Sequence, residues 1–198
     1  MQELLVDFIT SLDGYGGAEG WPGWWGLQGP EYLAWMEADS ARDATLLMGA
    51  NTYHMMRGFS AQADAGALAT DETAATDGLA QTQKVVFSST LKGPLDWANT
   101  RLVSTDAVEE VRRMKEEGDR PLSTLGSVAL CRSLLRAGLV DRFRVVVFPV
   151  ITGATGNARI YDGYPDVALD QVTTRTFDGT IQLLEGVPRI LDGPPSGS

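Results

Sequence analysis

Three buried-looking segments of the chain end in glycine or hydroxyl residues directly before a helix or a turn. They read LLMGANT at 46–52, VVFSST at 85–90 and STLGSVAL at 123–130. The carboxyl ends of parallel strands meet at one edge of a sheet, where helix N-termini offer free backbone N–H groups and a positive dipole end. Small residues let a phosphate approach the backbone, and hydroxyls add short hydrogen bonds. The pattern predicts a nucleotide site held mainly by backbone and hydroxyl groups.

The two common phosphate-binding motifs are missing from the sequence. No G-x-G-x-x-G follows the first strand, and no G-x-x-x-x-G-K-[ST] occurs anywhere. Each of the three segments alone is weak evidence, because glycine and serine also cap helices and close turns. Their recurrence at three strand ends favours a nucleotide site of another type.

Composition narrows the class of protein. With 198 residues and 43% hydrophobic content, the chain predicts one domain over 1–192 and a disordered tail over 193–198. No apolar run approaches the roughly 18 residues of a membrane span. Glu3 and Asp7 stand where a signal peptide carries Lys or Arg. We therefore expect a cytoplasmic protein that does not contact a membrane.

The net charge and the scarcity of cysteine and histidine argue against nucleic-acid-binding, disulfide-stabilised and metal-binding classes of protein. Twenty-six acidic residues against 16 basic ones give a formal net charge of -10, which argues against nucleic acid as a partner. Cys131 is the only cysteine and His54 the only histidine. The sequence therefore predicts no intrachain disulfide and no metal site.

The pattern of apolar runs and turn residues predicts the elements that position these strand ends. Expected strands cover 3–10, 44–49, 84–90, 100–105, 121–127 and 141–153, with a C-terminal hairpin of 171–177 and 180–186 around Asp178-Gly179. Expected helices cover 30–42, 51–58, 106–118 and 128–138, with 15–30 as a Trp-rich loop and 60–82 as partly helical surface. Alternating strands and helices predict an α/β fold, with a mixed, mostly parallel sheet covered on both faces.

An ordered set of motifs identifies a family resemblance. The segments are TSLDG (10–14), LLMGANTY (46–53), KVVFSSTL (84–91), LGSVALCRSLLRAGLVD (125–141) and FPVITGATG (148–156), followed by RTFDGTIQLLE (175–185). Together they resemble the dihydrofolate-reductase-like family that includes the C-terminal reductase domain of the riboflavin-biosynthesis protein RibD. The resemblance implies a three-layer α/β/α sandwich, a homodimer, and NADPH lying across the strand ends with a heterocyclic ring over the nicotinamide.

The resemblance also implies a set of cofactor-binding residues. Carried onto this chain, they are Gly49, Asn51 and Thr52 at the phosphates, Ser88, Ser89 and Thr90 near the adenosine ribose, and Leu125, Gly126, Ser127, Val128 and Ala129 at the pyrophosphate. One position departs from the family pattern. The usual arginine after Gly49, which can pair with the 2'-phosphate of NADPH, is Ala50 here. NADH is therefore admitted as a cofactor beside NADPH.

Candidate groups for the reaction are few. Asp13 and Thr10 are implied near the reacting rings, although Asp13 before Gly14 also suits a plain turn. Trp21, with Trp24 and Trp25, forms either an aromatic lid over the ring or a plug in the core or at a dimer interface.

On the substrate side the candidates are Glu31, Tyr32 and Tyr53 in addition to Trp21. Dihydrofolate reductases proper bind the pterin through a carboxylate on the first helix. The matching position here is Tyr32, with Glu31 beside it, so folate itself is a disfavoured substrate.

The sequence favours an NAD(P)H-dependent reductase that transfers hydride to a small planar heterocycle of pterin, aminopyrimidine or flavin-like type, without a metal. Two alternatives stay open. One is reduction of a ribosylamino-pyrimidine phosphate in riboflavin biosynthesis, which calls for a cationic cluster that the sequence does not offer. The other is a ligand-binding relative that has lost the cofactor, an alternative to which Ala50 gives weight.

Overall fold

The computed structural model describes residues 1–19, 24–40, 42–66 and 78–194. Trp21 and most of the expected C-terminal tail lie outside these ranges. The dominant feature is an eight-stranded sheet in the order β5-β4-β3-β6-β1-β7-β10-β9. Its strands are β1 (Leu4–Ser11), β3 (Thr45–Gly49), β4 (Lys84–Phe87), β5 (Thr100–Val103), β6 (Leu122–Thr124), β7 (Arg142–Phe148), β9 (Val167–Phe177) and β10 (Ile181–Ile190).

The pairing confirms the expected mixed sheet. The pairs among β5, β4, β3, β6, β1 and β7 are all parallel, whereas β10 runs antiparallel to β7 and to β9. The β9–β10 turn contains Asp178 and Gly179, both with positive φ (49° and 71°). This is the backbone that an Asp-Gly hairpin turn requires.

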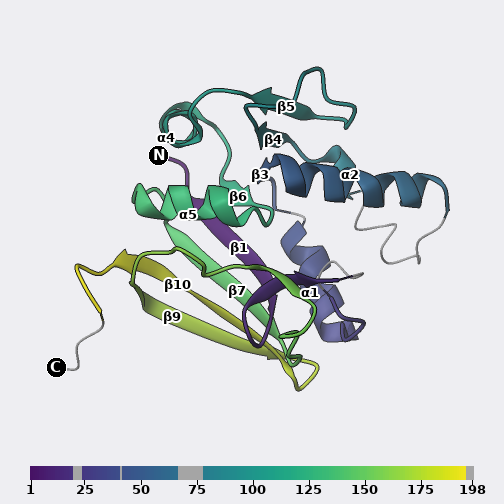
Figure 1. The fold of residues 1–198 in the computed structure, drawn as a ribbon, viewed down its shortest axis with the longest axis vertical. Coiled ribbons are helices and arrows are strands. Elements are labelled where there is room, and N and C mark those ends of the chain that lie inside the picture. The colour runs from purple at the N-terminus through teal and green to yellow at the C-terminus, as the bar shows by residue number, and fades with distance from the viewer. Residues whose placement is uncertain (20–23, 41, 67–77, 195–198) are drawn as a thin grey trace.

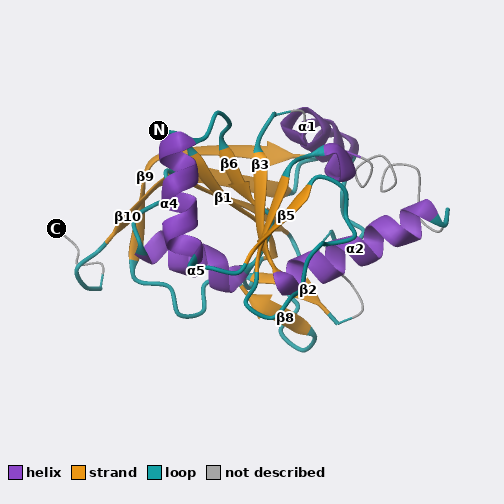
Figure 2. Ribbon diagram, turned by 90° about the horizontal axis from the view of Figure 1, so that it is seen from above, coloured by secondary structure: helices purple, strands orange, loops and turns teal. Residues whose placement is uncertain are grey.

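Helices cover both faces of the sheet (Figures 1 and 2). They are α1 (Pro30–Ser40), α2 (Ala50–Asp64), α4 (Ala107–Glu117) and α5 (Val128–Arg136). Figure 2 shows α4 and α5 on one side of the strands and α1 and α2 on the other. This confirms the α/β/α sandwich. Within the described ranges, no helix has both the length and the apolar character needed to cross a membrane.

Alternation along β1 explains how the layers form. Leu4, Val6 and Phe8 point to the face where Leu130, Cys131, Leu134 and Leu135 of α5 complete the main core. Ile9 points to the other face, where α1 packs against β7 and β10. A separate cluster of Met48, Tyr53, Val86 and Trp97 joins α2 to the same face beside β3 and β4.

The N-terminus of α1 is capped from the far end of the chain. The carboxylate of Asp178 accepts hydrogen bonds from the backbone N–H groups of Glu31 (3.0 Å) and Tyr32 (3.1 Å), and Glu31 Oε2 accepts one from the Asp178 N–H (2.7 Å). This reciprocal cap has the logic of a capping box, assembled across the fold. A Cβ on Gly29 would lie 2.2 Å from Asp178 Cγ, so a side chain at this position would have to displace the carboxylate.

The structure corrects the expected helix 51–58. Helix α2 begins at Ala50 and continues through Gly58 to Asp64. Glycine inside a helix lowers stability by only about 1 kcal/mol relative to alanine. The helical turns on either side of Gly58 are stable enough to offset this loss. The stop comes at Gly66, whose φ of 68° supplies the left-handed residue that ends many helices.

Other expected strand boundaries were also wrong, and the strands expected over 84–90 and 121–127 end early, at Phe87 and Thr124. The strand expected over 141–153 ends at Phe148, directly before Pro149, which has no N–H for a ladder. Part of the loop expected over 15–30 is a strand, since β2 (Tyr15–Ala18) pairs antiparallel with β8 (Gly156–Arg159) in a separate two-stranded sheet.

Two glycine substitutions test the trans-chain cap. We expect Gly29→Ala to lower the free energy of unfolding by about 1–2 kcal/mol, because the new methyl displaces the capping carboxylate. Gly58→Ala is the matched control, since a Cβ there meets nothing within 4 Å, and should raise stability by about 0.5–1 kcal/mol. Urea denaturation measures both, and equal effects at the two positions would contradict the cap.

Candidate nucleotide site at the carboxyl edge of the sheet

One hydroxyl joins the ends of β3 and β6. Ser127 Oγ accepts a hydrogen bond from the Gly49 N–H (2.7 Å) and lies 2.8 Å from Thr52 Oγ1. Gly49 is the N-cap residue of α2, and Ser127 is the N-cap residue of α5. The two segments that the sequence predicted to share an edge therefore meet there, with their helix starts side by side.

Both helix starts keep their backbone N–H groups free of side-chain caps. Neither Gly49 nor Ser127 makes a side-chain cap hydrogen bond, although such caps are the common way to satisfy the first turn. Gly126 and Ser127 both have positive φ, at 56° and 68°, which turns the chain sharply before Val128. Two adjacent uncapped N-termini form an anion-binding arrangement.

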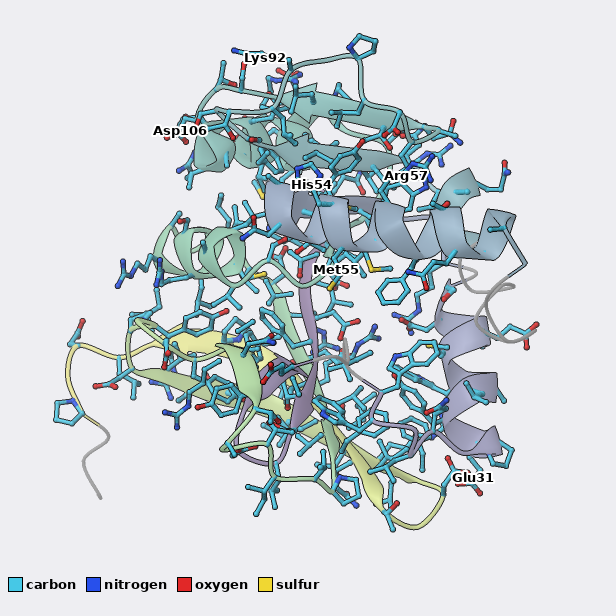
Figure 3. The ribbon with its side chains drawn as sticks, turned by 45° about the vertical axis from the view of Figure 1, so that its right-hand side comes forward. Glu31, His54, Met55, Arg57, Lys92 and Asp106 are labelled. Carbon is cyan, nitrogen blue, oxygen red and sulfur yellow. The ribbon has the colours of Figure 1, made fainter. Side chains whose placement is uncertain are left out.

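The third predicted strand end, after β4, is already occupied by local bonds, and the helix start after β5 is capped. After β4, Ser88 Oγ accepts from the N–H groups of Thr90 (3.2 Å) and Leu91 (3.1 Å), while Ser89 and Thr90 are exposed. After β5, Asp106 caps α4 by accepting from the Glu109 N–H at 3.0 Å. Figure 3 shows Asp106 and Lys92 across α2 from Glu31. The free helix starts are therefore those of α2 and α5.

The residue in place of the family arginine, Ala50, is the first residue of α2. It is half-buried, and its neighbour Asn51 is exposed. Further along the same helix, Arg57 lies with Nε 3.6 Å from Asp96 Oδ2. At position 50 itself the structure offers a methyl group to a bound dinucleotide.

The two candidate catalytic residues lie at the end of β1. Thr10 is buried in the strand. Asp13 Oδ1 accepts hydrogen bonds from Ser11 Oγ (2.6 Å) and the Thr152 N–H (3.1 Å), which tie the β1 turn to the segment after β7. The Ser11 hydrogen bond, with that from Thr152, holds the pKa of Asp13 below its ordinary value. Asp13 is thus an ionised turn residue at neutral pH, and a role near the ring stays a prediction.

The predicted substrate residues fall in three different places. The Glu31 carboxylate accepts the hydrogen bond from the Asp178 N–H in the α1 cap. Tyr53 is buried between α2 and the sheet, where its hydroxyl donates to Asp96 Oδ1 (2.6 Å). Tyr32 is fully buried against Phe148 and Phe177, and its hydroxyl has no hydrogen-bond partner among the described residues. Trp25 is partly buried and packs on Phe148 with ring centroids 5.7 Å apart, which places this tryptophan against the core.

A charged cluster that the sequence did not reveal lies beneath α1. Arg144 of β7 donates from Nε (2.9 Å) and Nη2 (2.7 Å) to the two carboxylate oxygens of Asp7 on β1. Its Nη1 and Nη2 also bind both oxygens of Asp39 on α1. Trp35 lies over the guanidinium at 4.9 Å. The only signal in the sequence was that Asp7 and Arg144 interrupt otherwise apolar strands.

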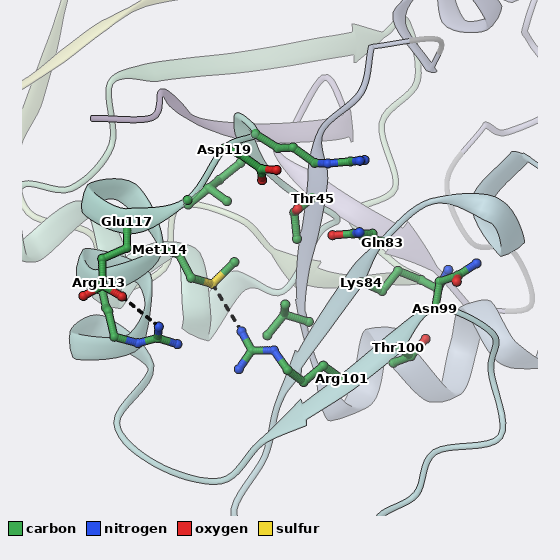
Figure 4. Close-up of a pocket in the computed structure, with 14 residues that line it drawn as sticks. Thr45, Gln83, Lys84, Asn99, Thr100, Arg101, Arg113, Met114, Glu117 and Asp119 are labelled. Carbon is green, nitrogen blue, oxygen red and sulfur yellow. Dashed lines mark hydrogen bonds and ion pairs between the residues drawn. The ribbon is translucent and has the colours of Figure 1, made fainter.

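A cavity of about 840 Å³ lies at the opposite edge of the sheet (Figure 4). Its lining includes Thr45, Lys84, Thr100 and Leu122, the first residues of β3, β4, β5 and β6. Arg101, Arg113 and Arg120 also line it, and each already binds a carboxylate. This cavity is at the amino ends of the strands and is separate from the uncapped helix starts.

Comparison with known proteins identifies the family of this chain. The sequence model described as the RibD C-terminal domain matches residues 2–183. The chain belongs to the RibD C-terminal domain family. Since the C-terminal domain of RibD is a reductase, its relatives include oxidoreductases of riboflavin biosynthesis.

Individual relatives of this RibD C-terminal family member are distant. A Bacillus subtilis protein named uncharacterized protein YyaP is 30% identical over 103 residues, which is 52% of this chain and 53% of that protein. Two solved structures share the fold. A putative riboflavin biosynthesis protein from Shewanella sp. PV-4 has TM-score 0.68 and 18% identity, covering 95% of this chain and 99% of that one. Dihydrofolate reductase from Enterococcus faecalis, complexed with NADP(H), has TM-score 0.60 and 13% identity, covering 94% and 96%.

The joint at Ser127 can be tested without any ligand. In this member of the RibD C-terminal domain family, Ser127→Ala should lower the free energy of unfolding by about 1–3 kcal/mol, because it leaves the Gly49 N–H without its acceptor. Amide hydrogen exchange at Gly49 should also become faster. Ser133→Ala on the same helix removes only an exposed hydroxyl bonded to its own helix and should change stability by less than about 0.5 kcal/mol. Unchanged exchange at Gly49 would contradict the joint.

The single thiol reports on the core beneath this edge. Cys131 is fully buried, its Sγ donates to the Gly126 carbonyl (3.0 Å), and burial raises its pKa to about 12. Iodoacetamide at pH 8 should therefore modify the protein only in denaturant, as read by mass spectrometry. Because the folded chain keeps a proton that the unfolded chain loses near pH 8.5, this group makes stability fall as pH rises toward 12. Rapid labelling of the folded protein would refute the burial.

Proposed function

We propose that the protein is an NAD(P)H-dependent reductase that transfers hydride to a small planar heterocycle. The observation that carries this proposal is the pair of uncapped helix starts, α2 and α5, joined by Ser127 at the carboxyl edge of the sheet. Membership of the RibD C-terminal family supports it. The fold shared with a dihydrofolate reductase complexed with NADP(H) supports the choice of cofactor.

The residues at the edge fit a dinucleotide. The first backbone N–H groups of α2 and α5 would hold the phosphates, and Gly49 and Gly126 present no side chain between them and the ligand. The exposed hydroxyls of Ser89 and Thr90 would meet the adenosine ribose. When bound, the dinucleotide supplies the hydride. The task of the chain is to align the acceptor ring and to keep water away from it.

Cofactor choice depends on position 50 in this proposal. An arginine there would pair with the 2'-phosphate through charge-assisted hydrogen bonds. With Ala50, the site takes NADPH and also admits NADH. Reduction of a ribosylamino-pyrimidine phosphate remains the alternative reaction, supported by the family name. We also propose that the substrate is a small molecule and that the protein is a homodimer.

Titration with NADPH and NADH tests the proposal directly. We expect saturable quenching of tryptophan fluorescence by both dinucleotides, with affinities within about tenfold of each other. The reason is that Ala50 cannot make the charge-assisted contact to the 2'-phosphate, which contributes about 1.5–3 kcal/mol where it is present. Ala50→Arg should shift the ratio toward NADPH by about tenfold or more. Gln62→Arg, which adds the same charge on the exposed last turn of α2, should leave the ratio unchanged. The reductase proposal fails if neither dinucleotide gives a response at millimolar concentration.

A further inference from the structure

Asp7 is more exposed than its position in the fold accounts for. It lies in the middle of β1, which has β6 on one side and β7 on the other, yet 26% of its side-chain surface is exposed. Its neighbours on the same face, Ser123 of β6 and Leu46 of β3, are also partly exposed. The face between α1 and α2 is therefore accessible above the central strands.

Asp7 also lies level with the start of the proposed phosphate-binding turn. Its backbone N–H donates to Thr124 Oγ1 at 3.1 Å. Thr124 is the last residue of β6, and Leu125, Gly126 and Ser127 follow it directly. A ring held beyond the phosphates at this edge would extend over β1 toward the carboxylate.

The two carboxylates of the cluster are paired unequally. Arg144 is shared between two carboxylates, and its side chain is only 3% exposed. Asp39 has a second partner in Arg42, whose Nε lies 3.1 Å from Asp39 Oδ1. Among the described residues, Asp7 pairs with Arg144 alone, and it is the more exposed carboxylate, at 26% against 17% for Asp39. Asp7 is therefore the carboxylate of the cluster that is more open to a further hydrogen-bond donor.

Hydrogen-bonding capacity remains at this carboxylate. Arg144 occupies one acceptor direction on each Asp7 oxygen, and a carboxylate offers about two directions per oxygen. The buried hydroxyl of Tyr32, which has no partner among the described residues, is close enough for the charge of Asp7 to add to the effect of burial in raising its pKa. A buried polar atom without a partner requires an explanation, and a bound ligand or water would supply one.

We propose that Asp7 is the specificity-determining residue on the substrate side, and that it accepts hydrogen bonds from an amino or amidinium edge of an unphosphorylated nitrogen heterocycle. Arg144 acts as a positioning residue that fixes the carboxylate plane through its bidentate contact. A partly buried negative charge repels a phosphate or a carbonyl edge and favours N–H donors. This inference rests on the proposed function for the orientation of the ring, and it narrows the substrate class away from a ribosylamino-pyrimidine phosphate.

The test uses two pyrimidines of the same size and opposite edges. Isothermal titration of the full chain with 2,4-diaminopyrimidine and with uracil should give a preference of about tenfold or more for the diamine, the size of one charge-assisted hydrogen bond. Asp7→Asn should reduce this preference to less than about threefold, because an amide offers a donor as well as an acceptor. Uridine 5'-monophosphate should bind more weakly than uracil.

Matched variants separate recognition from stability. Asp170→Asn, which changes an exposed carboxylate paired with Arg189 on the β9–β10 hairpin, should keep the wild-type preference. If Asp7→Asn does not fold, Asp7→Asn with Arg144→Met replaces the buried arginine by an apolar side chain while Asp39 keeps Arg42 as its partner, and the same loss of preference is expected. Equal binding of diamine and uracil by the wild type, or an unchanged preference in the folded variant, overturns the assignment.

The outcome is independent of the proposed cofactor. The pyrimidine titrations are made without a dinucleotide, so a selective diamine site together with no response to NADPH or NADH would refute the reductase and leave Asp7 as a ligand anchor. Dinucleotide binding without diamine preference would leave the reductase and refute the anchor.

Discussion

The hydrogen bond from the Gly49 N–H to Ser127 Oγ is the constraint on which the proposed site depends. It couples the end of β3 to the end of β6, and the contact with Thr52 Oγ1 adds the first turn of α2 to the same joint. Because the serine side chain is committed to this neighbour, it does not cap its own helix. The bond that fixes the two helix starts also leaves them open to an anion.

The two edges of the sheet differ in whether their hydrogen-bond donors already have partners. At the amino edge, the backbone N–H groups of the first strand residues are already bound, as in Thr45 to the Pro121 carbonyl (2.9 Å) and Lys84 to the Asn99 carbonyl (2.8 Å). The arginines of that cavity are likewise paired with carboxylates. At the amino edge, the cavity is therefore lined by donors that already have partners. At the carboxyl edge, α2 and α5 present their dipole ends and uncapped N–H groups, which makes it the better place for a phosphate.

The succession of strands and helices along the chain and the residue types at the strand ends were within reach of the sequence, because apolar runs and glycine-rich strand ends are local signals. Contacts that join distant segments were not. Asp178 caps α1 across 147 positions, and Arg144 binds Asp7 and Asp39 across 137 and 105 positions. Nothing in the local pattern distinguishes these aspartates from solvated turn or strand residues. The same limit applies to α2, since only the fold shows that Gly66, and not Gly58, has the left-handed backbone.

The groups at the two ends of the proposed site have partial charges of opposite sign. This difference would fix the direction in which a ligand binds. Helix starts at Gly49 and Ser127 present positive partial charge, while Asp7 presents a partly exposed carboxylate on the neighbouring central strand. A dinucleotide phosphate and an N–H-rich ring would each be stabilised at one end and destabilised at the other. The positive end described at Gly49 and Ser127 comes from backbone dipoles, and these favour an anion without demanding a 2'-phosphate. Ala50 is consistent with that division, because a site that gains phosphate affinity from the backbone can lose the arginine and still hold the pyrophosphate.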